Sequence, residues 1–314
     1  MGAEDAPAAL KGGSRLERVL AAGRFAVTAE IVPPASPDAS GVLASAKLLK
    51  GYADAFNATD SPRASVKMAS WAASVVLLRK GLEPIMQLVA RDRNRIALQA
   101  DVLGAAALGV RNVVCLRGDD PSAGNEKGAA GVHDLTTEEL IDTLRDLRER
   151  GRLRGGDPVD ARPKLFIGTT ADPFAGGLEG SFAKLRGKVE VGADFVQTQG
   201  VFDIEAFEEW VHLVRKDWLH ERVHVLAGVM PLRSARAARF VNEKVAGAAV
   251  PRQVLARLEK ASDPRAEGVR IAVETIEELR KVEGVHGVHI MAVGWEDAIP
   301  AIVERAGLHP RPRA

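Results

Sequence analysis

The 314-residue sequence is poor in cysteine, since Cys115 is its only one. A single thiol excludes an intrachain disulfide, and it excludes zinc or iron–sulfur sites that need several cysteine ligands. The seven histidines are scattered, and His286 and His289 have no third ligand in view, so we predict no metal site. A lone cysteine that forms no intrachain disulfide fits a reducing compartment, and the sequence shows no signal-peptide pattern, so we expect a cytoplasmic protein.

An excess of charge of one sign is also lacking. There are 43 Lys and Arg against 42 Asp and Glu, which gives a net charge of +1 with both signs interspersed. This balance gives no electrostatic basis for binding nucleic acid or an anionic membrane surface. No apolar run approaches the roughly 18 residues that a transmembrane helix needs. We therefore expect neither a nucleic-acid partner nor a membrane segment.

What the sequence does contain is a regular alternation of short apolar runs with longer amphipathic ones. The short runs are rich in Val, Ile and Phe, which is typical of buried parallel strands, and a helical pattern follows each of them. The predicted strands are Phe25–Val32, Asp54–Thr59, Pro84–Ala90, Asn112–Leu116, Lys164–Thr169, Asp194–Thr198, His224–Met230 and Gly287–Val293. Eight such units favour a closed (β/α)8 TIM barrel in a single domain.

An open doubly wound sheet that binds a dinucleotide is the alternative. It would place a GxGxxG motif after the first strand, where this chain has Pro33-Pro34 instead. We therefore expect a barrel domain over residues 15–314, preceded by a disordered Gly- and Ala-rich tail over residues 1–14.

Helix boundaries can be predicted for two of the amphipathic runs. The run "RIALQADVLGAAALG" should stop at Gly109, and Asp92 is a candidate to cap its start. The run "TTEELIDTLRDLRERG" should begin at a Thr136 or Thr137 cap and stop at Gly151.

Polar residues end nearly every predicted strand, and in a TIM barrel these ends share the face where chemistry takes place. Glu30 lies among apolar residues of the first strand. If it is buried, its protonated form is favoured and it could act as a general acid; it could equally be an outward-facing residue. Gln197 and Gln199 share one face of the sixth strand, and an amide can read a heterocycle edge or simply satisfy the barrel interior.

The segment "LRGDDP" follows the fourth strand. Gly118 would let the backbone approach a planar ligand, and Arg117 could meet a phosphate or carboxylate. Asp119 is the candidate for chemistry, whereas Asp120 and Pro121 are typical of a turn. A solvent-facing turn with a paired Arg and Asp is the alternative.

Together, "TAEIVPP", "NATD", "LGAAALGVRNVVCLRGD", "KVEVGADFVQTQGVFD" and "GVMP" resemble, in this order, short bacterial methylenetetrahydrofolate reductases. The resemblance extends from about Phe25 to Leu308. It implies a (β/α)8 barrel that binds FAD and reduces 5,10-methylenetetrahydrofolate to 5-methyltetrahydrofolate with NADH or NADPH.

The resemblance also implies roles for single residues. Glu30 matches the general acid that protonates the folate, Asp119 matches the aspartate beside flavin and pterin, and Gln199 matches the pterin-binding glutamine. Gln197 is its predicted companion in substrate binding. The flavin-contacting positions are matched by Thr59, Leu116, Arg117, Gly118 and Lys188.

Some positions depart from the family pattern. Gln87 stands where the family usually has His. Gly168–Pro173 stands where the family has Tyr-Pro-Glu-x-His-Pro, so Asp172 occupies the position of that histidine. The expected Phe after the seventh strand falls near Ala235. Gln87 and Asp172 remain predicted cofactor contacts, but the aromatic that would stack on the flavin is missing.

These departures leave several functions open. Hydride transfer could run through FAD or directly from the nicotinamide to the folate. A folate-binding subunit that takes electrons from a partner protein is an alternative, as is a flavin barrel acting on another substrate such as an amino acid. Assembly as a homo-oligomer is also compatible with the sequence.

Overall fold

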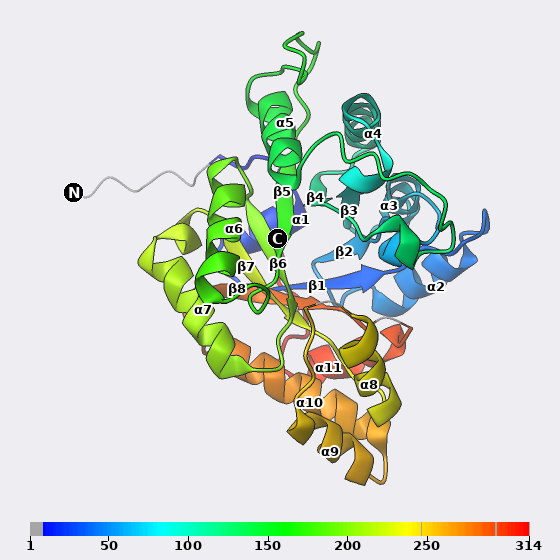
Figure 1. Ribbon diagram of the computed structural model, residues 1–314, viewed down its shortest axis with the longest axis vertical. Coiled ribbons are helices and arrows are strands. Elements are labelled where there is room, and N and C mark those ends of the chain that lie inside the picture. Colours follow the sequence, from blue (N-terminus) through cyan, green and yellow to red (C-terminus); the bar gives the residue numbers. More distant parts are fainter. Residues whose placement is uncertain (1–8, 246, 293, 314) are drawn as a thin grey trace.

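The computed structural model describes residues 9–245, 247–292 and 294–313. Eight parallel strands form one closed barrel in chain order, which confirms the predicted (β/α)8 fold (Figure 1). The strands are β1 (Ala26–Ile31), β2 (Ala55–Ala58), β3 (Pro84–Val89), β4 (Asn112–Leu116), β5 (Phe166–Ala171), β6 (Phe195–Gly200), β7 (His224–Val229) and β8 (Val285–Ile290).

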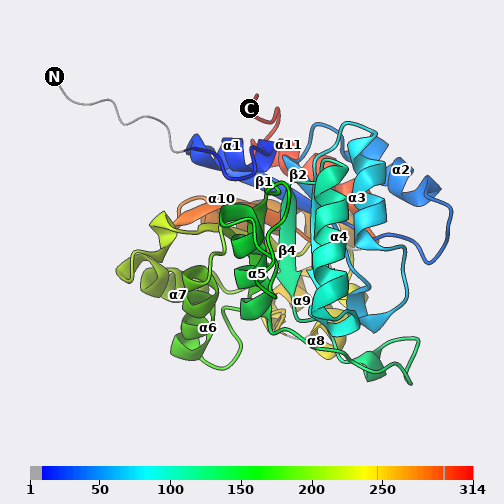
Figure 2. The same cartoon turned by 90° about the horizontal axis from the view of Figure 1, so that it is seen from above.

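Helices surround the barrel, and Figure 2 shows α1 and the C-terminus at one end of it and α8 at the other. The helices are α1 (Arg15–Ala21), α2 (Ser40–Leu49), α3 (Ser70–Leu78), α4 (Arg95–Ala107), α5 (Thr137–Glu149), α6 (Leu178–Glu190), α7 (Ile204–Lys216), α8 (Ala235–Lys244), α9 (Arg252–Lys260), α10 (Pro264–Leu279) and α11 (Ile299–Arg305). Because α8 follows β7, its end of the barrel is the one where the strands finish and where a TIM barrel carries its site.

The opposite end of the barrel is closed by apolar packing. Leu16, Val19 and Leu20 of α1 pack on the first inward-facing residues of the strands. Phe166 and Phe195 stack there with ring centroids 5.0 Å apart. The Phe195 ring occupies the space beside Gly168, where an added Cβ would lie 2.3 Å from the ring. The lower half of the barrel is therefore a solid core that supports the polar half above it.

The helix ends follow the capping signals, with one correction. Thr136 forms a capping box with Glu139 at the start of α5, as predicted. Asn94, not Asp92, caps α4: the Asn94 side chain accepts hydrogen bonds from two backbone N–H groups, whereas Asp92 pairs with Arg91. The prediction for Asp92 was wrong because that residue belongs to the 3-10 turn Ala90–Asp92 and lies two residues before the cap position.

Strand ends differ slightly from the predictions. β5 runs to Ala171 and β6 to Gly200, so Gln199 belongs to a strand. The predicted eighth strand ends at Val293, which lies outside the described residues.

The predicted tail of residues 1–14 lies largely outside the described residues, which begin at residue 9. Within the described part, the backbone N–H groups of Lys11, Gly12 and Gly13 donate to the Glu17 carboxylate. Ser14 is the N-cap of α1. The Glu17 carboxylate thus pairs backbone donors that would otherwise need water, whereas disorder of the tail stays a prediction.

Candidate active site

A layer of polar side chains crosses the barrel interior above the apolar core. Asn57 and Gln197 form a reciprocal amide pair: the Asn57 Nδ2 donates to Gln197 Oε1 at 2.7 Å, and the Gln197 Nε2 donates to Asn57 Oδ1 at 3.0 Å. The Gln197 Nε2 also lies 3.1 Å from Thr28 Oγ1 and 3.2 Å from His289 Nδ1. All four side chains are buried. Their mutual hydrogen bonds make this layer a fixed polar floor for whatever binds above it.

Glu30 lies directly above this floor. Its side chain is 15% exposed, and its Oε1 lies 3.6 Å from His289 Nε2 and 3.5 Å from Gln87 Nε2. The His289 Nδ1 lies against the Gln197 amide and the Thr28 hydroxyl, at 3.2 and 3.0 Å, and its Nε2 faces Glu30. Glu30 is therefore a carboxyl group at the barrel mouth with two side-chain nitrogens nearby and access to solvent.

The remaining side of Glu30 is bounded by Gln87 on β3. The Gln87 Oε1 accepts from the backbone N–H of Asp60, at 3.4 Å, which sets which end of the amide faces Glu30. Asp60 is itself fixed, because its carboxylate accepts from the Val89 N–H at 3.0 Å and from Arg93 at 2.6 Å. Gln87 thus takes part in the site as a neighbour of Glu30; a contact with a cofactor stays a prediction.

The end of β4 places Asp119 at the same end of the barrel. Its Oδ2 accepts from the backbone N–H of Arg63 at 2.7 Å, and its carbonyl accepts from Arg91. Gly118 has φ of 90°, and an added Cβ there would lie 2.4 Å from Val89, so only glycine fits. Arg117 is exposed.

The charged side chains near the end of β5 are hydrogen-bonded to the protein itself. The Asp172 Oδ1 accepts from the Phe174 N–H at 3.1 Å, and its other oxygen lies against Gly247, where a Cβ would be 1.8 Å away. Lys188 Nζ donates to the Thr170 carbonyl at 2.8 Å, and burial lowers the pKa of Lys188. Asp172 thus fixes the loop after β5 and Lys188 ties α6 to β5, and their predicted contact with a cofactor stays a prediction.

The two glutamines of β6 lie in different environments. Gln197 is part of the closed floor, whereas Gln199 is partly exposed and its Oε1 accepts from the Gly200 N–H at 3.0 Å. The register between β6 and β7 shifts between Gln197 and Gly200. The simple alternation expected for these residues is therefore interrupted by an irregularity, and Gln199 is the glutamine that a ligand at the mouth can reach.

Thr59 follows β2 at the mouth and has a property that points to a ligand. Its hydroxyl is buried and makes no hydrogen bond among the described residues. A buried hydroxyl without a partner is costly, so a bound group with a polar edge would satisfy it. Leu116, which ends β4 and is partly exposed, supplies apolar surface at the same end of the barrel.

His289 is the site residue that the sequence reasoning missed. His286 and His289 make no metal site without a third ligand, and neither is among the predicted site residues. In the barrel, alternation along β8 sends His289 inward, whereas the His286 Nδ1 accepts from the Val225 N–H on the neighbouring strand. The available signal was the place of His289 near the end of an apolar strand, the same signal that singled out Glu30.

Two classes of site find no support. In the part of the chain that the structure describes, no three His, Cys, Asp or Glu side chains are grouped so that they could hold a metal ion. Cys115 is fully buried, and burial raises the pKa of its thiol. None of the described helices is both long and apolar enough to cross a bilayer.

Comparisons with known proteins agree with this architecture. The family model for methylenetetrahydrofolate reductase matches residues 15–307. The chain is 28% identical over 213 residues to methylenetetrahydrofolate reductase 2 of Schizosaccharomyces pombe, covering 65% of this chain and 32% of that protein. It is 24% identical over 240 residues to 5,10-methylenetetrahydrofolate reductase of Pectobacterium carotovorum, covering 74% of this chain and 72% of that protein. The chain thus spans about a third of the yeast relative but most of the bacterial one.

A solved structure has the same fold. It is an uncharacterized protein from Clostridium thermocellum, described as binding two copies of 5-methyl-5,6,7,8-tetrahydrofolic acid. The TM-score is 0.64 at 14% identity, with 94% of this chain and 100% of that chain covered. The likeness shows the fold alone, whereas the match over residues 15–307 shows that this chain belongs to the methylenetetrahydrofolate reductase family.

Proposed function

We propose that the chain reduces 5,10-methylenetetrahydrofolate to 5-methyltetrahydrofolate, with NADH or NADPH as the electron donor. The observation that carries this proposal is Glu30: a carboxyl group above a fixed polar floor, at the mouth of a barrel of this family. The reaction needs one proton and one hydride. The proton goes to the ring nitrogen that leaves the methylene carbon, so that the ring opens to an iminium, and the hydride then adds to that carbon.

Glu30 is the proposed proton donor. Its two neighbours, Gln87 and His289, can donate hydrogen bonds to the carboxylate that remains after the proton has left. Gln199 and Asp119 would orient the pterin, since an amide and a carboxylate match its amide-like edge. Gln197, whose amide is already paired with Asn57, would hold the floor in place rather than contact the substrate.

FAD is the proposed resident cofactor, and the residues at the mouth fit its ring. The buried Thr59 hydroxyl, which has no partner among the described residues, suits the polar edge of the ring. Leu116 and Gly118 offer apolar surface and close backbone approach, and the exposed Arg117 is a cation that suits a phosphate. When bound, FAD supplies a two-electron carrier between nicotinamide and folate. The visible spectrum of the purified protein tests this part.

Direct hydride transfer is the second candidate, and a specific observation favours it. Gly168–Pro173 stands where the family has a segment with a tyrosine and a histidine, and Asp172 and Lys188 are both engaged by the protein itself. A colourless protein that oxidises the nicotinamide only when methylenetetrahydrofolate is present would support direct transfer.

The test of the function is turnover by the purified chain alone. Formation of 5-methyltetrahydrofolate at the expense of NADH or NADPH is expected; a chain that binds the folate but turns over only with an added electron-donating protein would instead be an accessory subunit.

Glu30→Gln tests the proton donor. This variant should lower folate reduction by about 10²–10⁴-fold, the usual contribution of a general acid, while any flavin reduction by the nicotinamide continues. Glu126→Gln, which changes an exposed carboxylate, is the matched control. Near-normal turnover by Glu30→Gln would refute the assignment.

A further inference from the structure

The segment that follows β2 has an unusual backbone. Ser61, Arg63 and Ala64 have φ of 45°, 53° and 51°, in the left-handed region that residues other than glycine seldom adopt. Such a conformation persists only where the surrounding structure fixes it, and it is found mainly at functional sites. The question is therefore what holds this segment and what it presents.

Contacts on both sides hold the segment in place. Before it, the Asp60 carboxylate pairs with Arg93, and Arg91 donates to the Ser61 carbonyl at 3.3 Å. After it, the Ala64 carbonyl packs so closely on Gly124 that an added Cβ would lie 1.8 Å from the oxygen.

Asp119 holds the middle of the segment through the Arg63 backbone N–H. The Arg63 side chain takes no part in any of these contacts, so it is what this strained backbone presents.

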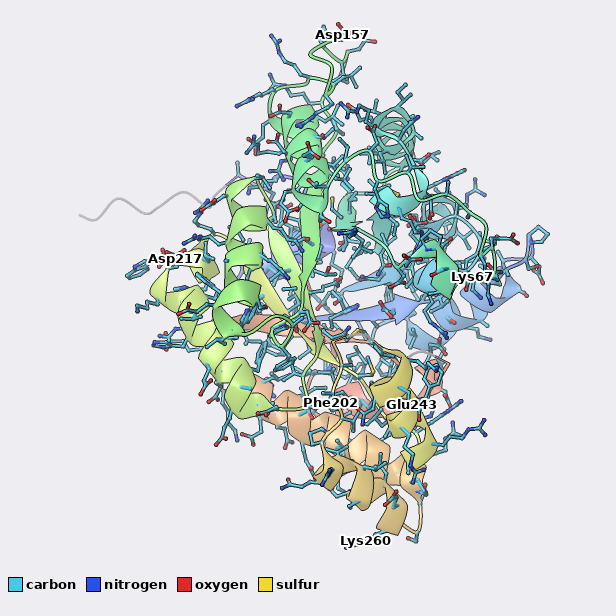
Figure 3. The ribbon with its side chains drawn as sticks, in the orientation of Figure 1. Lys67, Asp157, Phe202, Asp217, Glu243 and Lys260 are labelled. Carbon is cyan, nitrogen blue, oxygen red and sulfur yellow. The ribbon has the colours of Figure 1, made fainter. Side chains whose placement is uncertain are left out.

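The Arg63 guanidinium contacts α8, at the end of the barrel where the strands finish. Its central carbon is 5.7 Å from the centre of the Phe240 ring on α8. The segment follows β2 and α8 follows β7, and in the barrel these strands are separated only by β8 and β1, which carry His289 and Glu30. In Figure 3, Lys67 of the same loop and Glu243 of α8 are labelled on the same side of the barrel. The contact between Arg63 and Phe240 therefore joins elements that lie on either side of the two strands that carry His289 and Glu30.

The charge of Arg63 is not neutralised within the protein. Neighbouring Arg91 and Arg93 pair with Asp92 and Asp60, but among the described residues Arg63 belongs to no ion pair. Arg63 is exposed, and Phe240 is 47% exposed. The Phe240 ring takes one face of the guanidinium, so the N–H groups at its edge stay available to an anion.

We propose that Arg63 binds a carboxylate of the glutamate tail of the folate substrate. The inference rests on the proposed function. A tetrahydrofolate has a pterin at one end and a glutamate with two carboxylates at the other. If the pterin reaches Glu30, the tail must leave through the mouth, and the guanidinium at the rim matches a carboxylate in charge and geometry. Phe240 acts as a positioning residue that keeps Arg63 at this end of the barrel.

Equilibrium binding to the purified full-length chain tests the proposal without requiring turnover. The two probes are 5-methyltetrahydrofolate and 5-methyltetrahydropteroate, which lacks the glutamate. Arg63→Ala should weaken folate binding by about tenfold, the effect of losing one charge-assisted hydrogen bond, and leave pteroate binding unchanged. Arg63→Lys should recover part of the loss, because it restores the charge but not the planar fork.

The controls separate this role from a general effect of charge or folding. The Arg63 backbone N–H to Asp119 is retained in Arg63→Ala, so the Asp119 contact should survive. Arg239→Ala removes a cation from α8 that is already paired with Glu259, and it should change neither affinity. Phe240→Leu should weaken folate binding less than Arg63→Ala does.

Two results would overturn the inference: unchanged folate affinity in Arg63→Ala, or an equal loss for folate and pteroate. If the proposed function itself is wrong, the unmodified chain should bind neither probe. That result differs from the two above, and it would refute this inference together with the proposed function.

Discussion

Replacing Gln197 by Met tests whether this glutamine belongs to the scaffold or to the substrate site. Methionine has nearly the same length, so the change removes the amide with little change in volume. It leaves the Asn57 Oδ1 and Nδ2 without their partner in a side chain that is fully buried. It also removes the donor that faces Thr28 and His289.

The size of the effect follows from the groups left unpaired. A buried polar group without a partner costs about 1–3 kcal/mol, so the two Asn57 groups together should lower the free energy of unfolding by about 2–6 kcal/mol. Changing Asn57 to Leu as well removes both partners in favour of apolar groups of similar size. The double variant should therefore be more stable than Gln197→Met alone, although it carries one more substitution.

Urea unfolding of the two single variants and the double variant measures this cycle, with the folate KM determined in parallel. A loss below about 0.5 kcal/mol in Gln197→Met, together with a large rise in KM, would refute the scaffold role. It would return Gln197 to the substrate-binding residues, as the sequence suggested. Additive losses in the double variant would show that the amide pair contributes nothing as a pair.

Two further predictions concern the closed end of the barrel. The pKa of His224 is lowered from 6.5 to about 4, mainly by burial, so below pH 6.5 the unfolded chain binds a proton more readily than the folded one. This group should therefore lower the free energy of unfolding by about 3 kcal/mol between pH 6.5 and 4. In urea unfolding measured across pH, His224→Gln should lose that part of the pH dependence. Arg311, whose side chain is 4% exposed, pairs with the fully buried Asp54 at 2.6 Å; Arg311→Ala should cost about 3 kcal/mol because it strips a buried carboxylate of its closest cation, whereas exposed Arg313→Ala should cost little in the same assay.

The barrel could be predicted because its strands are buried on both faces. Continuous apolar runs such as Asn112–Leu116 are then visible in the sequence without any knowledge of neighbours. The capping signals at Thr136, Gly109 and Gly151 are equally local. Asp92 misled because two candidate caps, Asp92 and Asn94, lie within one turn, and only the backbone path decides between them.

The site was predictable only as far as chain position decides it. Strand ends share one face in a TIM barrel, which is enough to bring Glu30, Asp119 and Gln199 to the same end. The partners of these residues depend on contacts across the barrel. The pairing of Gln197 with Asn57 joins residues 140 positions apart, and the contact of Arg63 with Phe240 depends on a left-handed backbone that no sequence pattern signals.

The degree of hydrogen bonding divides the polar groups of the barrel into two sets. The side-chain amides of Asn57 and Gln197 find their partners inside the protein, so a ligand could contact them only by breaking bonds that already exist. Among the described residues, Glu30 has only long contacts, of 3.5 and 3.6 Å, and the buried Thr59 hydroxyl has no partner. Because unpaired buried groups cost stability, their persistence at the mouth is best explained by a ligand that pairs with them. The Asp172 and Lys188 side chains are likewise bonded within the protein, so their contact with a cofactor stays a prediction. The exposed Arg117 and Arg63, which form no ion pair among the described residues, are the better candidates to meet anionic groups of a ligand.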